Sequence, residues 1–292
     1  MKLLEQVLNR FHLNATIFHR ARMCNTWSTD TSGSGLASFH FISSGKAYLH
    51  AHELKGIELV AGDMVIFPHD AQHVIADTPD TELGAPFISH PIEKSIDNST
   101  GLVCGFFDFA EDAAHPLLMQ LPSCIVLKAK DTNGLTSHLI QALVAEAESG
   151  LDSSSILLSR LSEAFFIAVL RMLAKLDNQT GYFKALQDVK MSRVLEAIQQ
   201  NIAGNWTTQS LADTGGYSRA SFAKYFKEYF GTSVMDYLTQ LRLSEAQKRL
   251  RKGDSVFEVA LDVGYQSDAS FAKAYKRHFG YGPGESRKAK VK

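Results

Sequence analysis

Two short segments in the last third of the chain carry cations and small side chains at helical spacing. The stretch GYSRASFAKYFKEYFG begins at Gly216 and GYQSDASFAKAYKRHFG begins at Gly264, so ASFAK recurs at an offset of 49 residues, from Ala220 to Ala269. Lysine and arginine donate hydrogen bonds to phosphates and guanine, aspartate accepts from cytosine, and alanine lets a helix approach closely. The chemistry that this pattern supports is contact with a nucleic acid.

Each segment has an aromatic face and a basic face when it is drawn as a helix. Aromatic residues at four-residue spacing predict a buried stripe: Phe222, Phe226 and Phe230, with Tyr225 filling the stripe, then Phe271, Tyr275 and Phe279. The opposite faces carry Arg219, Ala220, Ala223, Lys224 and Lys227 in the first copy and Asp268, Ala269, Ala272, Lys273, Lys276 and Arg277 in the second. A basic face that meets only water is the alternative, and one such helix alone would favour it.

The residues before each copy favour DNA binding. Short helices are predicted from about Thr208 and about Ser255, each followed by a glycine turn and a serine N-cap, Ser218 or Ser267. A helix, a tight turn and a second helix form the helix-turn-helix motif, whose second helix lies in the major groove of DNA. A connecting helix that ends at Gly253 would hold the two copies about one DNA turn apart, roughly 34 Å.

Charge is distributed unevenly along a chain of 292 residues whose net charge is −1. Residues 188–292 hold 17 Lys and Arg against 11 Asp and Glu, a net of +6, which leaves 13 basic and 20 acidic residues, a net of −7, for residues 1–187. A basic part joined to an acidic one indicates that only the first meets a polyanion.

Composition limits the class of protein. No apolar run approaches the roughly 20 residues that span a bilayer, and the N-terminus lacks a signal-peptide pattern. Three cysteines do not suggest a disulfide framework. We therefore expect a cytoplasmic protein of two domains with no membrane partner.

The last hundred residues resemble the DNA-binding domain of AraC/XylS-type bacterial transcription regulators. The matching segments are WTTQSLADTGGYSRASFAKYFKEYFG, YLTQLRLSEAQKRL and VFEVALDVGYQSDASFAKAYKRHFGYGPGESR, with Val234 where the family usually has proline. The resemblance implies binding to double-stranded promoter DNA, contact with RNA polymerase and, more often than not, activation. It also implies that the predicted base readers are Arg219, Ala220, Ala223, Lys224, Asp268, Ala269, Ala272 and Lys273. Lys227, Lys276 and Arg277 are then the predicted phosphate contacts, which makes binding salt dependent.

The first two thirds of the chain predict a different architecture. Short β-type runs with glycine, proline and aspartate between them, from about 14 to 130, indicate a small barrel or sandwich. The segment GDMVIFPHDAQHVIAD, from Gly62 to Asp77, resembles the second motif of cupin barrels, with Asp70 where glycine is usual. We therefore predict an α+β multidomain chain: a cupin-like β-barrel with a helical pair, then an all-α tandem helix-turn-helix domain.

The predicted boundaries follow from these changes of pattern. Residues 1–176 form the sensing and dimerisation domain, with the barrel at about 14–130 and the helices at about 134–176. Residues 177–188 are the linker. Residues 189–292 bind DNA, with helix-turn-helix units at about 208–229 and 255–278.

Histidines in the barrel raise the question of a metal. Metal-dependent cupins use a His-x-His pair on an earlier strand, where this chain has none, while His50 and His52 form such a pair on another strand. Together with His40, His69 and His73 they could gather at a barrel mouth, since imidazoles suit Zn, Cu or Fe. The alternative is surface or hydrogen-bonded core histidines. We predict no metal and no cofactor, and His50, His52 and His73 are the candidate ligands if a metal is bound.

The sensor part contains the segments ARMCNTW and GLVCGFFDFAEDAAHPLLMQLPSCIVL. With them it resembles a cupin-sensor branch of the AraC family that includes a regulator of reactive chlorine, which senses through cysteine oxidation. That resemblance implies redox sensing by Cys104 and Cys24, since an accessible thiol of low pKa can form a reversible disulfide. Buried, unreactive cysteines are the alternative. The effector is thus a small molecule or an oxidant, with His40, His73, Cys24 and Cys104 as sensing candidates.

Two apolar helical segments follow the barrel. The first has Leu135, Leu139, Leu143 and Val144 on one face, and the second is apolar nearly all round, which predicts burial. They either complete the sensor core or, as the resemblance implies, make a homodimer that doubles the DNA contacts. The predicted function is a DNA-binding transcription regulator that is not an enzyme. The rival is a metal-dependent cupin enzyme with an accessory DNA-binding domain.

Overall fold

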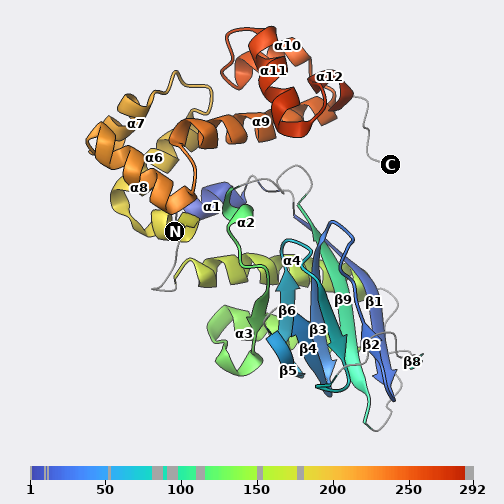
Figure 1. The fold of residues 1–292 in the computed structure, drawn as a ribbon. Helices are drawn as coiled ribbons and strands as arrows, with labels where there is room; N and C mark the ends of the chain where they lie inside the picture. Colours follow the sequence, from blue (N-terminus) through green and yellow to red (C-terminus); the bar gives the residue numbers. More distant parts are fainter. Residues whose placement is uncertain are drawn as a thin grey trace. The chain divides into compact units, whose positions relative to one another are not determined.

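A computed structural model describes residues 2–9, 11, 13–51, 54–80, 88–90, 98–109, 116–149, 154–175 and 181–286. Contacts divide the chain into two units (Figure 1). The sheet unit comprises Leu13–Phe109 and Leu121–Leu170, and the helical unit comprises Met1–His12, Ala110–Gln120 and Arg171–Lys292. The helical unit therefore takes in three segments that precede the predicted DNA-binding domain, namely 1–12, 110–120 and 171–188.

The sheet unit is built from two antiparallel sheets. Its strands are β1 (Asn14–Cys24), β2 (Ser28–Thr29), β3 (Ala37–Ser44), β4 (Lys46–Ala51), β5 (Leu54–Val60), β6 (Met64–Phe67), β7 (His73–Ala76), β8 (Ile88–His90), β9 (Thr100–Asp108) and β10 (Ile125–Leu127). One sheet has the order β10-β6-β3-β9-β1-β8 and the other β2-β7-β4-β5. A single apolar cluster draws on both sheets, with Trp27, Leu49, Phe67 and Leu102 among its members. The predicted β-architecture is confirmed.

The turn between β6 and β7 explains one departure from the cupin motif. Asp70 lies in the left-handed region with φ +54°, a conformation that glycine adopts without strain and that Asp tolerates. Its carboxylate accepts hydrogen bonds from the amides of Gly33 and Gly35. Asp70 thus adopts the left-handed backbone conformation that glycine would adopt here, and its carboxylate also holds the loop before β3 in place.

Two helices pack on the sheets: α3 (Gly134–Ala147) and α4 (Ser154–Leu173), after the short 3-10 turn η2 (Ala129–Asp131). Glu163 of α4 accepts from the Ala15 amide of β1, and Phe166 packs on Phe107 of β9. The predicted inner faces need correction. On α3 the core face is made by Thr136, Ile140, Leu143 and Ala147, and on α4 Ile156 is 71% exposed, so α4 is not buried all round.

The helical unit consists of α1 (Lys2–Leu8), α2 (Pro116–Met119), α5 (Gly181–Gln187), α6 (Val189–Gln200), α7 (Thr208–Gly215), α8 (Arg219–Phe230), α9 (Val234–Lys252), α10 (Val256–Asp262), α11 (Asp268–Phe279) and α12 (Pro283–Ser286). The predicted linker 177–188 is partly wrong, because residues 181–187 form α5 and pack on α6 and α8. Residues 177–180 lie outside the described residues. Within this unit α2 contacts α5, with the Gln120 side chain accepting from the Tyr182 amide.

The helix α9 serves two cores. Near its start Tyr237 packs against Phe226 and Phe230 of α8, with ring centroids 5.3 and 5.0 Å apart. Further along, Leu243, Ala246 and Leu250 join a second cluster with Val259, Phe271 and Tyr275. Two helix-turn-helix units, α7–α8 and α10–α11, therefore pack on successive parts of one helix, as the sequence predicts.

The helix ends agree with the predicted caps. The side chains of Ser218 and Ser267 accept from the amides of Ser221 and Ser270, at the starts of α8 and α11. The helix α9 ends at Gly253, whose φ of +103° is left-handed. One aromatic position differs from prediction, because Tyr225 is 43% exposed and packs beside Tyr217 instead of entering the core.

None of the helices in the described part of the chain combines the length and the apolar character that spanning a bilayer requires.

The two aromatic positions of α8 provide a test of this core. Phe226 is fully buried, so Phe226→Ala should lower the free energy of unfolding of the helical unit by about 3–5 kcal/mol. Tyr225→Ala, one residue away on the exposed face, should lower it by less than about 1 kcal/mol. Urea unfolding followed by circular dichroism measures both, and equal losses would contradict the described packing.

Candidate functional site

The exposed face of α8 carries the first set of predicted DNA contacts. Arg219, Ala220, Ala223, Lys224 and Lys227 are all exposed, while Phe222, Phe226 and Phe230 on the other side are buried. Lys224 approaches Glu228 one turn later, with Nζ 3.9 Å from Oε1. Such an exposed pair contributes little, so a phosphate or base can replace it.

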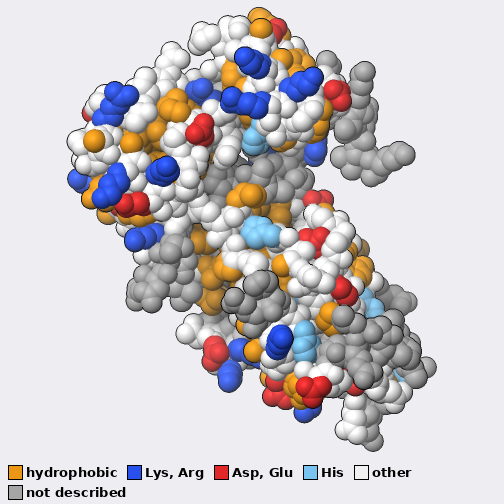
Figure 2. Space-filling model, viewed as in Figure 1, with side chains coloured by type: hydrophobic (Ala, Val, Ile, Leu, Met, Phe, Trp, Pro, Cys, Tyr) orange, Lys and Arg blue, Asp and Glu red, His pale blue; other side chains and the backbone are white. Residues whose placement is uncertain are grey.

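The second recognition helix presents the same arrangement. Asp268, Ala269, Lys273, Lys276 and Arg277 of α11 are exposed and Ala272 is half-buried, opposite the buried Phe271 and Tyr275. Figure 2 shows Lys and Arg side chains outnumbering Asp and Glu over the visible face of the helical unit. Both helices therefore offer cations and small residues to solvent, which is what entry into a major groove requires.

One carboxylate fixes the first recognition helix at both ends. Asp188 accepts from the hydroxyls of Tyr217 in the turn and Tyr229 near the end of α8, at 3.1 and 2.9 Å. Its Oδ1 also caps α6 through the Lys190 and Met191 amides. Burial alone would raise the pKa of the Asp188 carboxyl, yet these hydrogen bonds bring the pKa below its ordinary value. The face of α8 is thus held in a fixed orientation.

The interior of the sheet unit holds a chain of polar side chains. Cys104 Sγ lies 3.0 Å from His40 Nδ1, and His40 Nε2 lies 2.9 Å from His73 Nε2. The Thr31 hydroxyl is 3.0 Å from His73 Nε2 and 3.1 Å from His40 Nε2, and His73 Nδ1 is 2.7 Å from the Ala71 carbonyl oxygen. One tautomer set satisfies this network: the thiol donates to His40, His40 Nε2–H to His73, and His73 Nδ1–H to Ala71.

Burial governs the protonation of this cluster. It lowers the pKa of His40 well below the ordinary 6.5, helped by the nearby His73 and His19, and it lowers the pKa of His73. It also raises the pKa of the Cys104 thiol above its ordinary range. Cys104 is 1% exposed. Of the two alternatives for Cys104, this structure shows the buried thiol and not an accessible thiol of low pKa. It also brings three of the four sensing candidates, His40, His73 and Cys104, together.

The structure separates the other sensing candidate from this cluster. Cys24 is buried at the end of β1 opposite Ile88, whereas Cys104 lies opposite His19. Five residues along a strand correspond to roughly 16 Å, too far for a disulfide, whose Cα atoms lie about 5.5–6 Å apart. Cys124 is half-buried, and burial raises its pKa to about 11.

The remaining histidines do not gather at one place. His69 contacts the Leu121 carbonyl and His50 the Thr78 carbonyl. Ala51 is the strand partner of His73, so His50 faces the other side of β4. His52 lies outside the described residues. Within the described ranges no group of three or more His, Cys, Asp or Glu side chains has a geometry that holds a metal.

Two members of the cluster region were not predicted. The strand register puts His19 directly opposite Cys104, and its Nε2 is buried without a hydrogen-bond partner. Thr31 reaches the cluster from a loop. The alternation of inward and outward side chains along β1 would have placed His19 beside Cys104 only if the pairing of β1 with β9 were known. No sequence signal indicated Thr31.

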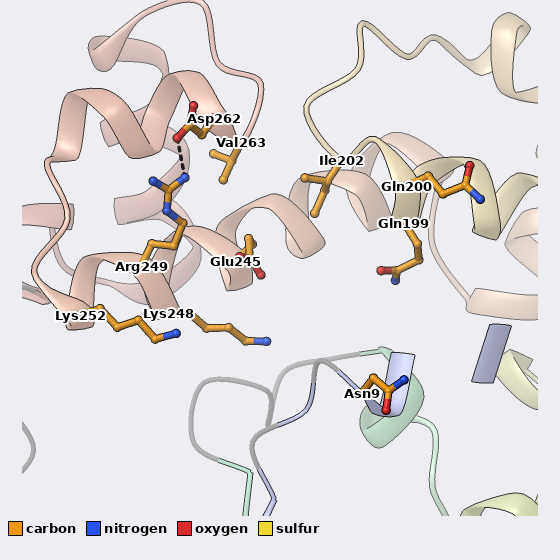
Figure 3. Close-up of a pocket in the computed structure, with 10 residues that line it drawn as sticks. All are labelled: Asn9, Gln199, Gln200, Ile202, Glu245, Lys248, Arg249, Lys252, Asp262 and Val263. Atoms are coloured by element: carbon orange, nitrogen blue, oxygen red, sulfur yellow. Dashed lines mark hydrogen bonds and ion pairs between the residues drawn. The ribbon is translucent and has the colours of Figure 1, made fainter. Parts of the chain in front are cut away.

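A cavity of about 480 Å³ lies within the helical unit (Figure 3). It is bordered by Gln199 and Ile202 at the end of α6, by Lys248, Arg249 and Lys252 of α9, and by Asp262 and Val263 at the end of α10. Arg249 is paired with Asp262 at 2.6 Å and with Asp254 at 2.8 Å. Most of the side chains that line the cavity are therefore polar or charged, with Ile202 and Val263 as the apolar ones.

Comparisons with known proteins agree with both halves of this description. A sequence model of the cupin family matches residues 2–175, and a helix-turn-helix domain model matches 211–289. An uncharacterized HTH-type transcriptional regulator of Haemophilus influenzae is 27% identical over 89% of this chain and 90% of its own. The RCS-specific HTH-type transcriptional activator RclR of Escherichia coli is 30% identical over 71% of this chain and 68% of its own. A solved AraC-type DNA-binding domain from Chromobacterium violaceum is 28% identical over 37% of this chain and 97% of that one, with a TM-score of 0.35.

The lowered pKa values predict a pH-dependent stability of the sheet unit. In the unfolded chain His40 and His73 take up protons as the pH falls through the ordinary histidine pKa of 6.5. In the folded chain their pKa values are lower, so they stay neutral at that pH and protonation favours unfolding. The melting temperature should be constant above about pH 7 and fall from pH 6.5 to pH 5. The His40→Gln variant should have a lower melting temperature at pH 7.5, and its melting temperature should fall less steeply between pH 6.5 and pH 5. An unchanged slope in the variant would contradict the assignment to His40.

Proposed function

The chain belongs to the AraC-type transcription regulators that carry an N-terminal cupin domain, and from this premise we propose how its two parts act. It is a DNA-binding transcription regulator and not an enzyme, since relatives along most of its length are named as transcriptional regulators. The rival interpretation, a metal-dependent cupin enzyme with an accessory DNA-binding domain, is thereby set aside.

We propose that the exposed faces of α8 and α11 read promoter DNA. The observation that carries this proposal is their repeated geometry, in which each serine-capped helix follows a tight turn and exposes small and cationic residues. Arg219 and Lys224 can donate to guanine, and Asp268 can accept from the cytosine amino group. The alanines at 220, 223, 269 and 272 leave room for thymine methyls, and Lys227, Lys276 and Arg277 contact phosphates.

We propose that the first part, residues 1–176, senses a small effector or an oxidant in the cytoplasm and that residues 189–292 respond. The two are joined through 177–188, of which residues 181–187 form the helix α5. The Thr31–His40–His73–Cys104 cluster supports the site, because a buried network of titratable groups changes its protonation when a ligand or oxidation disturbs it. RclR is named as an activator. We propose activation here too, through contact with RNA polymerase.

The protein acts as a homodimer in this proposal, and α4 is the contact. Ile156 and Ile167 lie on its exposed face, three turns apart, with Leu157 beside the first. A stripe of exposed apolar residues on one helix is typical of a subunit interface. Two protomers would then present their DNA-binding units to one promoter at a raised effective concentration.

The DNA-reading faces have a direct test. Lys224→Ala and Lys273→Ala should each weaken binding to a specific duplex by about 1–3 kcal/mol if they contact bases. Lys46→Ala, an exposed lysine of the sheet unit, is the matched control and should leave the affinity unchanged. Fluorescence anisotropy with a duplex selected from a random library measures all three. Unchanged affinity in both helix variants would refute these faces.

The dimer contact has a second test. Ile156→Glu and Ile167→Glu should convert the dimer to a monomer at micromolar concentration, because a buried unpaired carboxylate strongly opposes association. Leu261→Glu, at an equally exposed leucine of α10, should have no effect. Light scattering after gel filtration gives the mass. A dimer that survives both α4 substitutions would exclude this contact.

A further inference from the structure

One side chain of α9 contacts the loop before the first helix-turn-helix unit and the turn of the second. Arg242 lies between Tyr237, which packs with the first unit, and Leu243, which packs with the second. Its Nε donates to the Ile202 carbonyl at 2.8 Å and its Nη2 to the Gly204 carbonyl at 2.7 Å, both in the loop between α6 and α7. Its Nη1 is 3.5 Å from the Gly264 carbonyl oxygen, in the turn between α10 and α11. We call residues 202–204, Arg242 and Gly264 the junction.

The junction partners are themselves held in place. In the 202–204 loop the Trp206 Nε1 donates to the Asn201 carbonyl at 2.7 Å, and a Cβ on Gly204 would lie 2.7 Å from that same nitrogen. On the other side Gly264 has φ +88°, and a Cβ there would lie 2.7 Å from the Ala203 carbonyl oxygen and 2.8 Å from Arg242 Nη2. The two backbones therefore approach as closely as glycine allows, with the guanidinium between them.

The residues around Arg242 explain why an arginine suits this position. The polar cavity of about 480 Å³ separates Ile202 from Val263 on one side of the junction (Figure 3). The second unit has an apolar cluster of its own, drawn from α9, α10 and α11. A guanidinium is a planar fork of five donors, so it can fix the angle between several carbonyls where one ammonium cannot.

We propose that Arg242 is a specificity-positioning residue that sets the spacing between the two DNA segments contacted by α8 and α11. This inference rests on the proposed DNA-reading faces. It follows because α9 fixes the distance between the two units along its axis, whereas rotation of one unit about that axis is limited at the junction. One inserted base pair moves the second DNA segment by about 3.4 Å and rotates it by roughly 35°, so a rigid junction penalises it.

The test is a spacing preference measured with the full chain. A duplex selected from a random library by the wild-type protein is compared with the same duplex carrying one base pair inserted between the two contacted segments. The wild type should prefer the original spacing by about tenfold or more, and Arg242→Ala by less than about threefold. Arg242→Lys should retain an intermediate preference, and Gly264→Ala, which forces the junction apart from the other side, should reduce it as well.

A matched control separates this role from general stability. Arg249→Ala removes another arginine of α9, whose partners Asp254 and Asp262 lie at the end of α9 and on α10. It should keep the full spacing preference even if it melts earlier. If Arg242→Ala shows no cooperative melting, Arg242→Lys and Gly264→Ala carry the test.

The outcomes distinguish the two levels of the proposal. Equal weakening on both duplexes in the Arg242 and Gly264 variants, with the preference intact, would reduce Arg242 to a stabilising residue and overturn the inference. If Lys224→Ala and Lys273→Ala leave the affinity unchanged in the same assay, the DNA-reading faces fail instead. Loss of preference in the junction variants together with weakened binding in the lysine variants supports both.

Discussion

The DNA-binding half depends on one continuous helix that belongs to two cores. The 19 residues of α9 rise about 1.5 Å each, so the helix is roughly 28 Å long, close to the 34 Å pitch of B-DNA. In the first half of α9, Tyr237 packs in the aromatic core of α8. In the second half, Leu243, Ala246 and Leu250 pack against α10 and α11. Because a helix resists bending, α9 keeps the two recognition helices at a fixed separation.

The sensor half depends on the opposite property, which is a polar network enclosed in an apolar core. His40, His73 and Cys104 lie among Phe67, Leu102 and Ile75, and the His73 ring stacks on Phe67 with centroids 3.6 Å apart. The thiol of Cys104 and the ring N–H groups of His40 and His73 each have an acceptor in this network, so in the proposed sensing role an effector that binds or oxidises one member would leave another unsatisfied. A ligand shifts a regulator only through unequal affinity for two states, and a coupling of about 1–3 kcal/mol is typical. That energy is comparable to one or two hydrogen bonds of the cluster.

Local patterns in the sequence predicted the helical half well, and contacts between distant segments limited the prediction elsewhere. The caps Ser218 and Ser267, the glycine at 253 and the aromatic stripes depend on neighbours within one or two turns. The structure has them as predicted, except that Tyr225 is exposed and Phe279 is half-buried. The α3 face was shifted by one position because Ile140 and Ala147, not Leu139 and Val144, meet the sheet. The linker became helical because Tyr182 and Phe183 are buried against α6 and α8, which the sequence around them does not reveal. The sensor cluster joins β3 and β9 of one sheet, β7 of the other sheet and a loop, so it depends on the strand register and on the packing of the two sheets, which local patterns do not reveal.

We propose that two matched helices, held by α9, enter consecutive major grooves on one face of a duplex. Dimethyl sulfate protection of a duplex selected by the protein tests it most directly, because the reagent methylates guanine N7 in the major groove. For each protomer the account predicts two protected patches about 10–10.5 base pairs apart, centre to centre, on the same face. A single patch per protomer, or contact confined to the minor groove, would contradict it.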